Sequence, residues 1–131
     1  RSRGLGDVYK RQELFILMFL LRGLPFVDLA YLRKSDLRGD VITYRRRKTG
    51  RPLSVTLTPE AMFLLQKYMN RDKRSPYLFP ILRSAEGSPE AYREYQLALR
   101  HFNYQLELLG RFLGLKDRLS SYTAKHNQFS I

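Results

Sequence analysis

A run of cationic side chains is the part of this sequence with the clearest chemistry. Residues 44–57, "YRRRKTGRPLSVTL", place five cations within seven positions: Arg45, Arg46, Arg47, Lys48 and Arg51. Guanidinium and ammonium groups bind phosphate oxygens through charge-assisted hydrogen bonds, and arginine can form two such bonds in parallel. The run therefore indicates a site for a phosphate-bearing partner, with an ordinary solvated loop as the alternative.

The whole chain is basic. Its 131 residues include 24 Lys and Arg against 12 Asp and Glu, which gives a formal net charge of +12. Such an excess favours a polyanion as the partner. Cysteine is absent, which excludes disulfides and cysteine-ligated zinc or iron–sulfur centres, and we expect no cofactor or metal. The lack of cysteine also favours a cytoplasmic location.

The first twelve residues differ from the rest of the chain. Residues 1–12, "RSRGLGDVYKRQ", have no apolar period and resemble translated adapter sequence, so the fold is predicted from residue 13 onward. Without Asp7 and the four basic groups of this tail, the net charge falls only from +12 to +9. The longest apolar run, Leu14–Leu21, has eight residues, against about 20 for a membrane span. We expect residues 13–131 to form one domain, or part of one, outside the membrane.

The spacing of apolar residues predicts the elements that position the basic run. A buried helix is expected from Glu13 to about Arg22, followed by a break and a short helix that Pro25 opens. The β-branched segments 41–44 and 53–57 alternate with period two, which predicts an antiparallel hairpin with one apolar face. The cationic run would then occupy the tip of this hairpin.

Two further helices are expected after the hairpin. Thr58 and Ser88 suit N-cap positions, because each is followed by a proline that can start a helix. The first of these helices should end near Asn70. An apolar stripe in alternating steps of three and four marks the second: Tyr92, Tyr95, Leu99, Phe102, Leu106, Leu109 and Leu113. We expect the middle of this stripe, Tyr95 to Leu106, to be buried, with a coiled-coil seam as the alternative. The predicted fold class is mainly α with a small antiparallel β-hairpin or sheet, an α+β domain.

Three segments carry a resemblance to a known family. They are "LLRGLPFVDLAYLRKSDL", "ITYRRRKTGRPLSVTL" and "SYTAKH", between about Glu13 and His126. In this order they resemble the catalytic domain of tyrosine recombinases of the phage integrase family, especially the integrases of Bacteroides-type mobile elements. The order of the elements makes the resemblance specific, because any one of them alone would be weak. It implies an incomplete recombinase catalytic domain.

The resemblance also implies DNA breaking and rejoining without a metal. In this family a tyrosine attacks the scissile phosphate, arginines and histidines stabilise the developing charge, and a hairpin lysine acts at the leaving 5′ oxygen. Lys48 matches that lysine. Arg22 stands near the position of the first family arginine, although its side chain could equally extend from an apolar helix into solvent.

The box "SYTAKH" departs from the family pattern. Tyr122 stands at the first histidine position, Lys125 at the arginine position, and His126 at the next histidine, for which a structural role is the alternative. Lysine lacks the planar fork that grips two phosphate oxygens, so reduced activity is expected. None of the nine tyrosines matches the nucleophile, which follows this box in the family. We expect the nucleophile beyond Ile131 and the fragment alone to be inactive.

The sequence thus predicts a fragment of a site-specific DNA recombinase, with residues 13–131 as a partial catalytic domain that binds double-stranded DNA. The DNA contacts are assigned to five cations: Arg45, Arg46, Arg47, Arg51 and Lys34. In the complete protein the resemblance implies strand exchange through a phosphotyrosine intermediate by an oligomer on DNA. The alternative is a non-catalytic nucleic-acid-binding module that uses the same basic hairpin.

Overall fold

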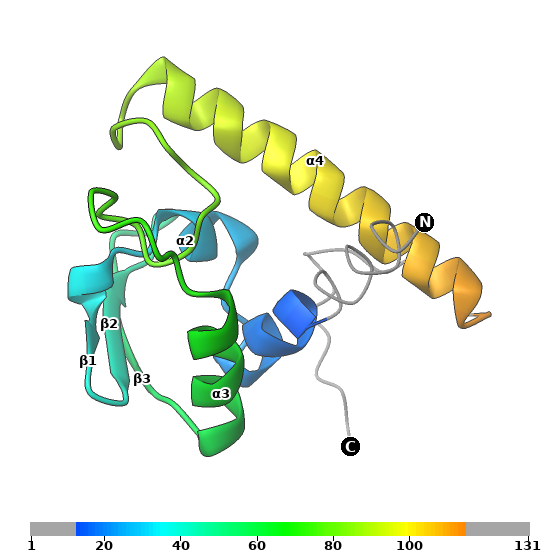
Figure 1. The fold of residues 1–131 in the computed structure, drawn as a ribbon, viewed down its shortest axis with the longest axis horizontal. Coiled ribbons are helices and arrows are strands. Elements are labelled where there is room, and N and C mark those ends of the chain that lie inside the picture. Colours follow the sequence, from blue (N-terminus) through cyan, green and yellow to red (C-terminus); the bar gives the residue numbers. More distant parts are fainter. Residues whose placement is uncertain (1–12, 115–131) are drawn as a thin grey trace.

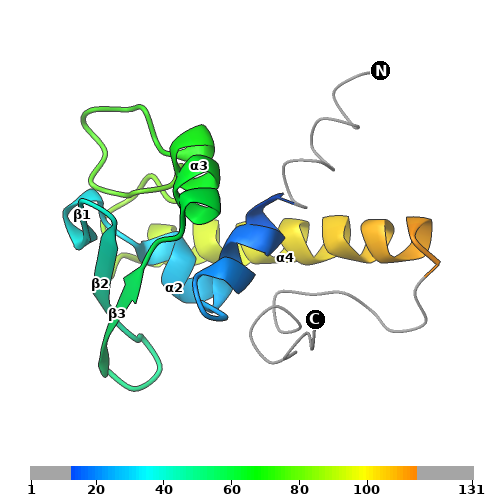
Figure 2. The same ribbon diagram turned by 90° about the horizontal axis from the view of Figure 1, so that it is seen from below.

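The structure, a computed structural model, describes residues 13–114 (Figures 1 and 2). The elements in chain order are a helix over residues 13–20, α2 (Phe26–Tyr31), the 3-10 helix η1 (Lys34–Asp36), β1 (Leu37–Arg38), β2 (Val41–Arg45), β3 (Pro52–Thr56), α3 (Pro59–Tyr68) and α4 (Pro89–Phe112). Helices predominate over one small antiparallel sheet, which confirms the predicted α+β fold class. Within residues 13–114, no helix is both long and apolar enough to cross a bilayer.

The three strands form an antiparallel sheet in the order β1–β2–β3, and β2 and β3 are the predicted hairpin. Their side chains alternate between a packed and an outer face, so that Ile42 and Val55, which are directly paired, are both buried. The last pair of the hairpin is Arg45 with Pro52. Because β1 pairs only with the first two residues of β2, the β2–β3 turn lies at the other end of the sheet.

Local sequence determines where α3 and α4 begin. Thr58 Oγ1 accepts a hydrogen bond from the Ala61 amide at 3.1 Å, and Ser88 Oγ accepts one from the Ala91 amide at 3.1 Å. Proline follows each cap, where a missing amide hydrogen leaves no helical bond unmade. Both predicted N-caps are therefore confirmed. α3 ends at Tyr68, slightly before its predicted end.

The middle of the apolar stripe on α4 packs into the core, but less completely than predicted. Phe102 and Leu106 are 1% and 0% exposed, and Phe102 stacks on Phe26 of α2 with ring centroids 4.8 Å apart. Tyr95 and Leu99 contact the same core yet stay partly exposed, so their predicted burial is wrong in degree. Burial of the central residues within one chain favours an internal helix over the coiled-coil alternative.

The two ends of the stripe, Tyr92 and Leu113, are exposed. For the C-terminal end Figure 1 shows the reason: α4 crosses the domain beside α2, and its last turns extend past the other labelled elements. α4 is longer than the surface it covers. Its apolar stripe therefore continues beyond the core that residues 13–114 provide.

Candidate nucleic-acid interface

Backbone hydrogen bonds close the turn between β2 and β3 that carries the cationic run. The Arg46 amide donates to the Arg51 carbonyl at 2.8 Å, and the Gly50 amide donates to the Arg46 carbonyl at 2.6 Å. Gly50 has a φ of +74°, a left-handed conformation that strains residues with a Cβ. The turn therefore has a defined conformation, and Figure 2 shows it projecting from the end of the sheet.

Three of the five cations at this turn form no ion pair with an acidic side chain of residues 13–114. Lys48 and Arg51 are exposed, and their side chains make no hydrogen bond to that part of the chain. Arg45 is also exposed and donates from its guanidinium to the Gly50 carbonyl at 3.1 Å. These three side chains present uncompensated positive charge at the projecting end of the sheet, where a phosphate backbone could approach.

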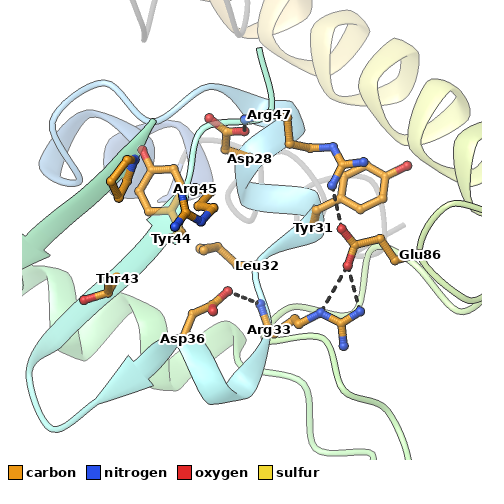
Figure 3. Close-up of a pocket in the computed structure, with 11 residues that line it drawn as sticks. Asp28, Tyr31, Leu32, Arg33, Asp36, Thr43, Tyr44, Arg45, Arg47 and Glu86 are labelled. Carbon is orange, nitrogen blue, oxygen red and sulfur yellow. Dashed lines mark hydrogen bonds and ion pairs between the residues drawn. The ribbon is translucent and has the colours of Figure 1, made fainter. Parts of the chain in front are cut away.

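The other two cations are connected to α2 through Asp28. The Asp28 side chain is only 1% exposed, and its Oδ1 accepts a hydrogen bond from the Arg47 amide at 3.0 Å. Its Oδ2 lies 4.0 Å from Arg46 Nε. Figure 3 shows this carboxylate on α2 facing the segment that follows β2. The hydrogen bond from the Arg47 amide to this buried carboxylate fixes the base of the turn on the helix, and Arg46 adds a longer ion pair.

Beside the turn, Glu86 bridges two arginines (Figure 3). Its Oε1 accepts from Arg33 Nη2 at 2.7 Å, and its Oε2 accepts from Arg47 Nη1 at 2.8 Å. The Arg47 guanidinium also covers the Tyr31 ring, 3.7 Å from the ring centroid. Partial burial acts to raise the pKa of Glu86, but the hydrogen bonds from Arg47 and Arg33 lower that pKa below its ordinary value. Glu86 is therefore held as a carboxylate.

These groups line a pocket of about 430 Å³ next to the hairpin. Its wall holds three guanidinium groups and three carboxylates, from Arg33, Arg45, Arg47, Asp28, Asp36 and Glu86. The two kinds of charge balance in this lining, and the guanidinium groups are the part of it that can bind anionic oxygens. Among residues 13–114, no group of three or more His, Cys, Asp or Glu side chains could hold a metal ion.

The other predicted site residues lie on different elements. Arg22 follows the first helix, is exposed, and has a φ of +64°. Lys34 lies in η1 beside β1, and its Nζ donates to the Asp72 carbonyl at 2.6 Å, which braces the loop between α3 and α4. The structure therefore does not bring Lys34 to the β2–β3 turn. Three predicted residues lie outside the described part of the chain: Tyr122, Lys125 and His126.

Sequence reasoning missed Asp28, Arg33 and Glu86. A carboxylate inside the apolar segment "FVDLAY", shortly before a cationic run, is a signal that could have identified Asp28. No local pattern marks Glu86, because its partners Arg33 and Arg47 lie 53 and 39 positions away.

A comparison with solved structures relates this fold to a recombinase. The chain is similar to XerA recombinase, whose crystal structure is known, with a TM-score of 0.54 and 18% sequence identity. The similarity covers 89% of this chain and 46% of the XerA chain, so the chain spans less than half the length of that protein. No protein-family model and no curated protein sequence matches the chain. At this level of identity the similarity shows a recombinase-like fold.

Proposed function

We propose that this chain is part of the catalytic domain of a site-specific DNA recombinase and binds double-stranded DNA through the β2–β3 turn. The observation that carries the proposal is the exposed Lys48, which a hairpin holds at the projecting end of the sheet in a recombinase-like fold. The resemblance in sequence gives a lysine at this place a defined role in phosphoryl transfer. The complete protein would act as an oligomer on DNA, as an integrase of a mobile element.

Charge and rigidity both support DNA binding by the turn. Lys48, Arg51 and Arg45 offer positive charge that is not neutralised within residues 13–114, on a chain with a net charge of +12. Cations of this kind gain affinity for DNA by releasing condensed counterions from the phosphates. Asp28 fixes the turn through the Arg47 amide, so little conformational entropy would be lost when DNA binds.

The same turn could serve strand cleavage in the complete protein. The tyrosine hydroxyl would release its proton to solvent, and its oxygen would form a bond to phosphorus while the bond from phosphorus to the 5′ oxygen breaks. The Lys48 ammonium would donate its proton to that leaving oxygen, which becomes a hydroxyl. The covalent phosphotyrosine then keeps the phosphodiester bond energy for rejoining. Lys125 would hold the scissile phosphate in place of the family arginine, with a weaker grip.

Duplex DNA binding as a function of salt tests the proposal on the chain itself. Alanine at Arg45, Lys48 and Arg51 should weaken binding to all duplex sequences and lower the slope of log affinity against log salt, by up to about 0.9 per lost phosphate contact. The matched control removes the same charge from the loop between α3 and α4, with alanine at Arg71, Lys73 and Arg74. Equal slopes for the two triple variants would contradict a specific role for the turn.

A non-catalytic nucleic-acid-binding module is the second candidate. Lys125 at the arginine position favours it, because an ammonium cannot grip two phosphate oxygens as a guanidinium does. Both candidates bind through the hairpin, so binding alone does not separate them. Sequencing the parent gene across both ends does: a tyrosine-bearing helix downstream of the "SYTAKH" box favours the recombinase.

A further inference from the structure

Two arginines, Arg33 and Arg47, form an anion site that the Glu86 carboxylate occupies. Arg33 donates from both Nε and Nη2 to one Glu86 oxygen, at 3.1 and 2.7 Å, and Arg47 Nη1 donates to the other oxygen at 2.8 Å. Both oxygens of one carboxylate are therefore engaged by guanidinium groups from two different elements. We call Arg33 and Arg47 the two-arginine site; they line the pocket next to the hairpin.

The donors of this site also suit a phosphodiester. A backbone phosphate, like a carboxylate, carries one negative charge shared over two free oxygens, and guanidinium groups bind both kinds of anion. Arg47 is held independently of Glu86, because its amide donates to Asp28 and its guanidinium lies over Tyr31. At least this half of the site would stay in place if the carboxylate left.

Glu86 is positioned so that it can leave. Its side chain is 33% exposed in a loop, and exposed ion pairs of this kind are individually weak. The next residue, Gly87, has a φ of +88°, and no atom lies within 4 Å of the place where its Cβ would be. The chain around Glu86 therefore has open space on one side.

We propose that the two-arginine site binds a phosphate of the DNA backbone beside the Lys48 turn, and that Glu86 occupies this site as an internal competitor when DNA is absent. The inference rests on the proposed function, since it takes duplex DNA as the partner. It adds Arg33 to the interface and accounts for the pairing of Arg47 in the free chain. Because a phosphate must displace Glu86 to enter the two-arginine site, the competitor lowers the affinity of the chain for DNA that uses this site.

Neutralising the competitor tests this site. Glu86→Gln should bind a duplex oligonucleotide about 3- to 30-fold more tightly at low salt, because the two arginines no longer have to exchange an ionic partner. Glu90→Gln is the matched control: Glu90 is exposed, close in sequence, and forms no ion pair within residues 13–114. Its gain should stay below about 2-fold, the effect of charge alone. Glu86→Ala, a second variant, should show the same gain as Glu86→Gln.

A second substitution assigns the gain to the arginines. In the Glu86→Gln background, Arg33→Ala should remove most of the gain and lower the salt slope by up to about 0.9, the value for one phosphate contact. Thermal unfolding of each variant confirms that the compared proteins are folded at the assay temperature.

The outcomes separate this site from the proposed function. If the chain binds duplex DNA through the Lys48 turn, but Glu86→Gln behaves like Glu90→Gln or binds more weakly than the wild type, the competitor is overturned and the function stands. An unchanged salt slope in the Arg33→Ala variant overturns the phosphate contact in the same way. If neither the wild type nor Glu86→Gln binds duplex DNA at low salt, the function and this site are both overturned.

Discussion

Asp28 of α2 accepts a hydrogen bond from the backbone amide of Arg47, 3.0 Å away, and so joins a short buried helix to the cationic turn through one carboxylate. Because the donor is a backbone group, the anchor does not depend on the side chain at position 47. The Arg47 guanidinium remains available for Glu86 and Tyr31. The turn can therefore be held rigid while its cations contact other groups.

Removing this anchor should destabilise the domain and loosen the turn. Asp28→Ala leaves the Arg47 amide without its carboxylate acceptor, and we expect a loss of about 1–3 kcal/mol in the free energy of unfolding. Asp28→Asn retains a side-chain oxygen and should lose less. Urea unfolding measures the loss of stability of the domain. Hydrogen exchange of the Arg47 amide measures how far the turn has loosened. If both variants unfold and exchange like the wild type, Asp28 does not hold the turn.

The role of Arg22 in DNA binding can be tested with a variant that should keep the domain folded. Its φ of +64° strains an arginine, whereas asparagine tolerates this left-handed conformation. Arg22→Asn should therefore keep or slightly raise the free energy of unfolding. If the guanidinium contacts a phosphate, the same variant should bind duplex DNA more weakly, with a salt slope lower by up to about 0.9. Unchanged DNA binding would leave Arg22 as a solvent-exposed residue that only ends the first helix.

The stacked pair of Phe26 and Phe102 should carry much of the packing between α2 and α4. Phe102 is 1% exposed, so Phe102→Ala should lower the free energy of unfolding by about 3–5 kcal/mol through lost burial and a cavity. Leu97 on the same helix is 60% exposed, and Leu97→Ala should change the free energy of unfolding by less than about 0.5 kcal/mol. Similar losses for the two variants would contradict the orientation of α4.

Glu94 should make stability depend on acid pH. Partial burial acts to raise its pKa, but hydrogen bonds from the Arg83 and Ser84 amides and the Ser84 hydroxyl lower that pKa below its ordinary value of 4.5. The folded state thus binds the proton less readily than the unfolded state. The resulting stabilisation is complete above the ordinary pKa and is lost as the pH falls through the folded-state pKa.

Thermal unfolding from pH 7 to pH 3 measures this dependence. Glu94→Gln should be less stable than the wild type at neutral pH, and the difference should shrink below about pH 4.5. Glu86→Gln should show the same sign for the same reason, since the pKa of Glu86 is also lowered. A constant difference between the wild type and Glu94→Gln across this range would contradict the role of the carboxylate.

Features that depend on neighbouring residues could be predicted from the sequence. The caps at Thr58 and Ser88 and the alternation in β2 and β3 are of this kind, since each needs only a few adjacent side chains. The burial predicted for the middle of the stripe on α4 was too complete, because Tyr95 and Leu99 contact the core and stay partly exposed. Helical period reports which residues share a face, and it does not report how long the opposing surface is.

The organisation of the candidate site was less predictable. The sequence places five cations at the turn, yet it does not reveal that two of them are paired in the folded chain. Arg47 meets Asp28 and Glu86 only because α2 and the loop before α4 come together in space. Contacts of this kind depend on tertiary packing, so charge density alone overestimates how many cations are unpaired in the free chain.

Trapping of a covalent complex tests the central claim most directly. A parent protein that continues to the expected nucleophile, with Lys125→Arg to restore the guanidinium fork, should form a covalent adduct with a nicked suicide DNA duplex. Lys48→Ala should then slow cleavage roughly 10²- to 10⁴-fold for the normal 5′ oxygen, and far less for a better leaving group that needs no proton. Equal slowing on both substrates would show that Lys48 only binds phosphate. The absence of any covalent adduct from the Lys125→Arg parent would contradict the assignment of this chain to a DNA recombinase.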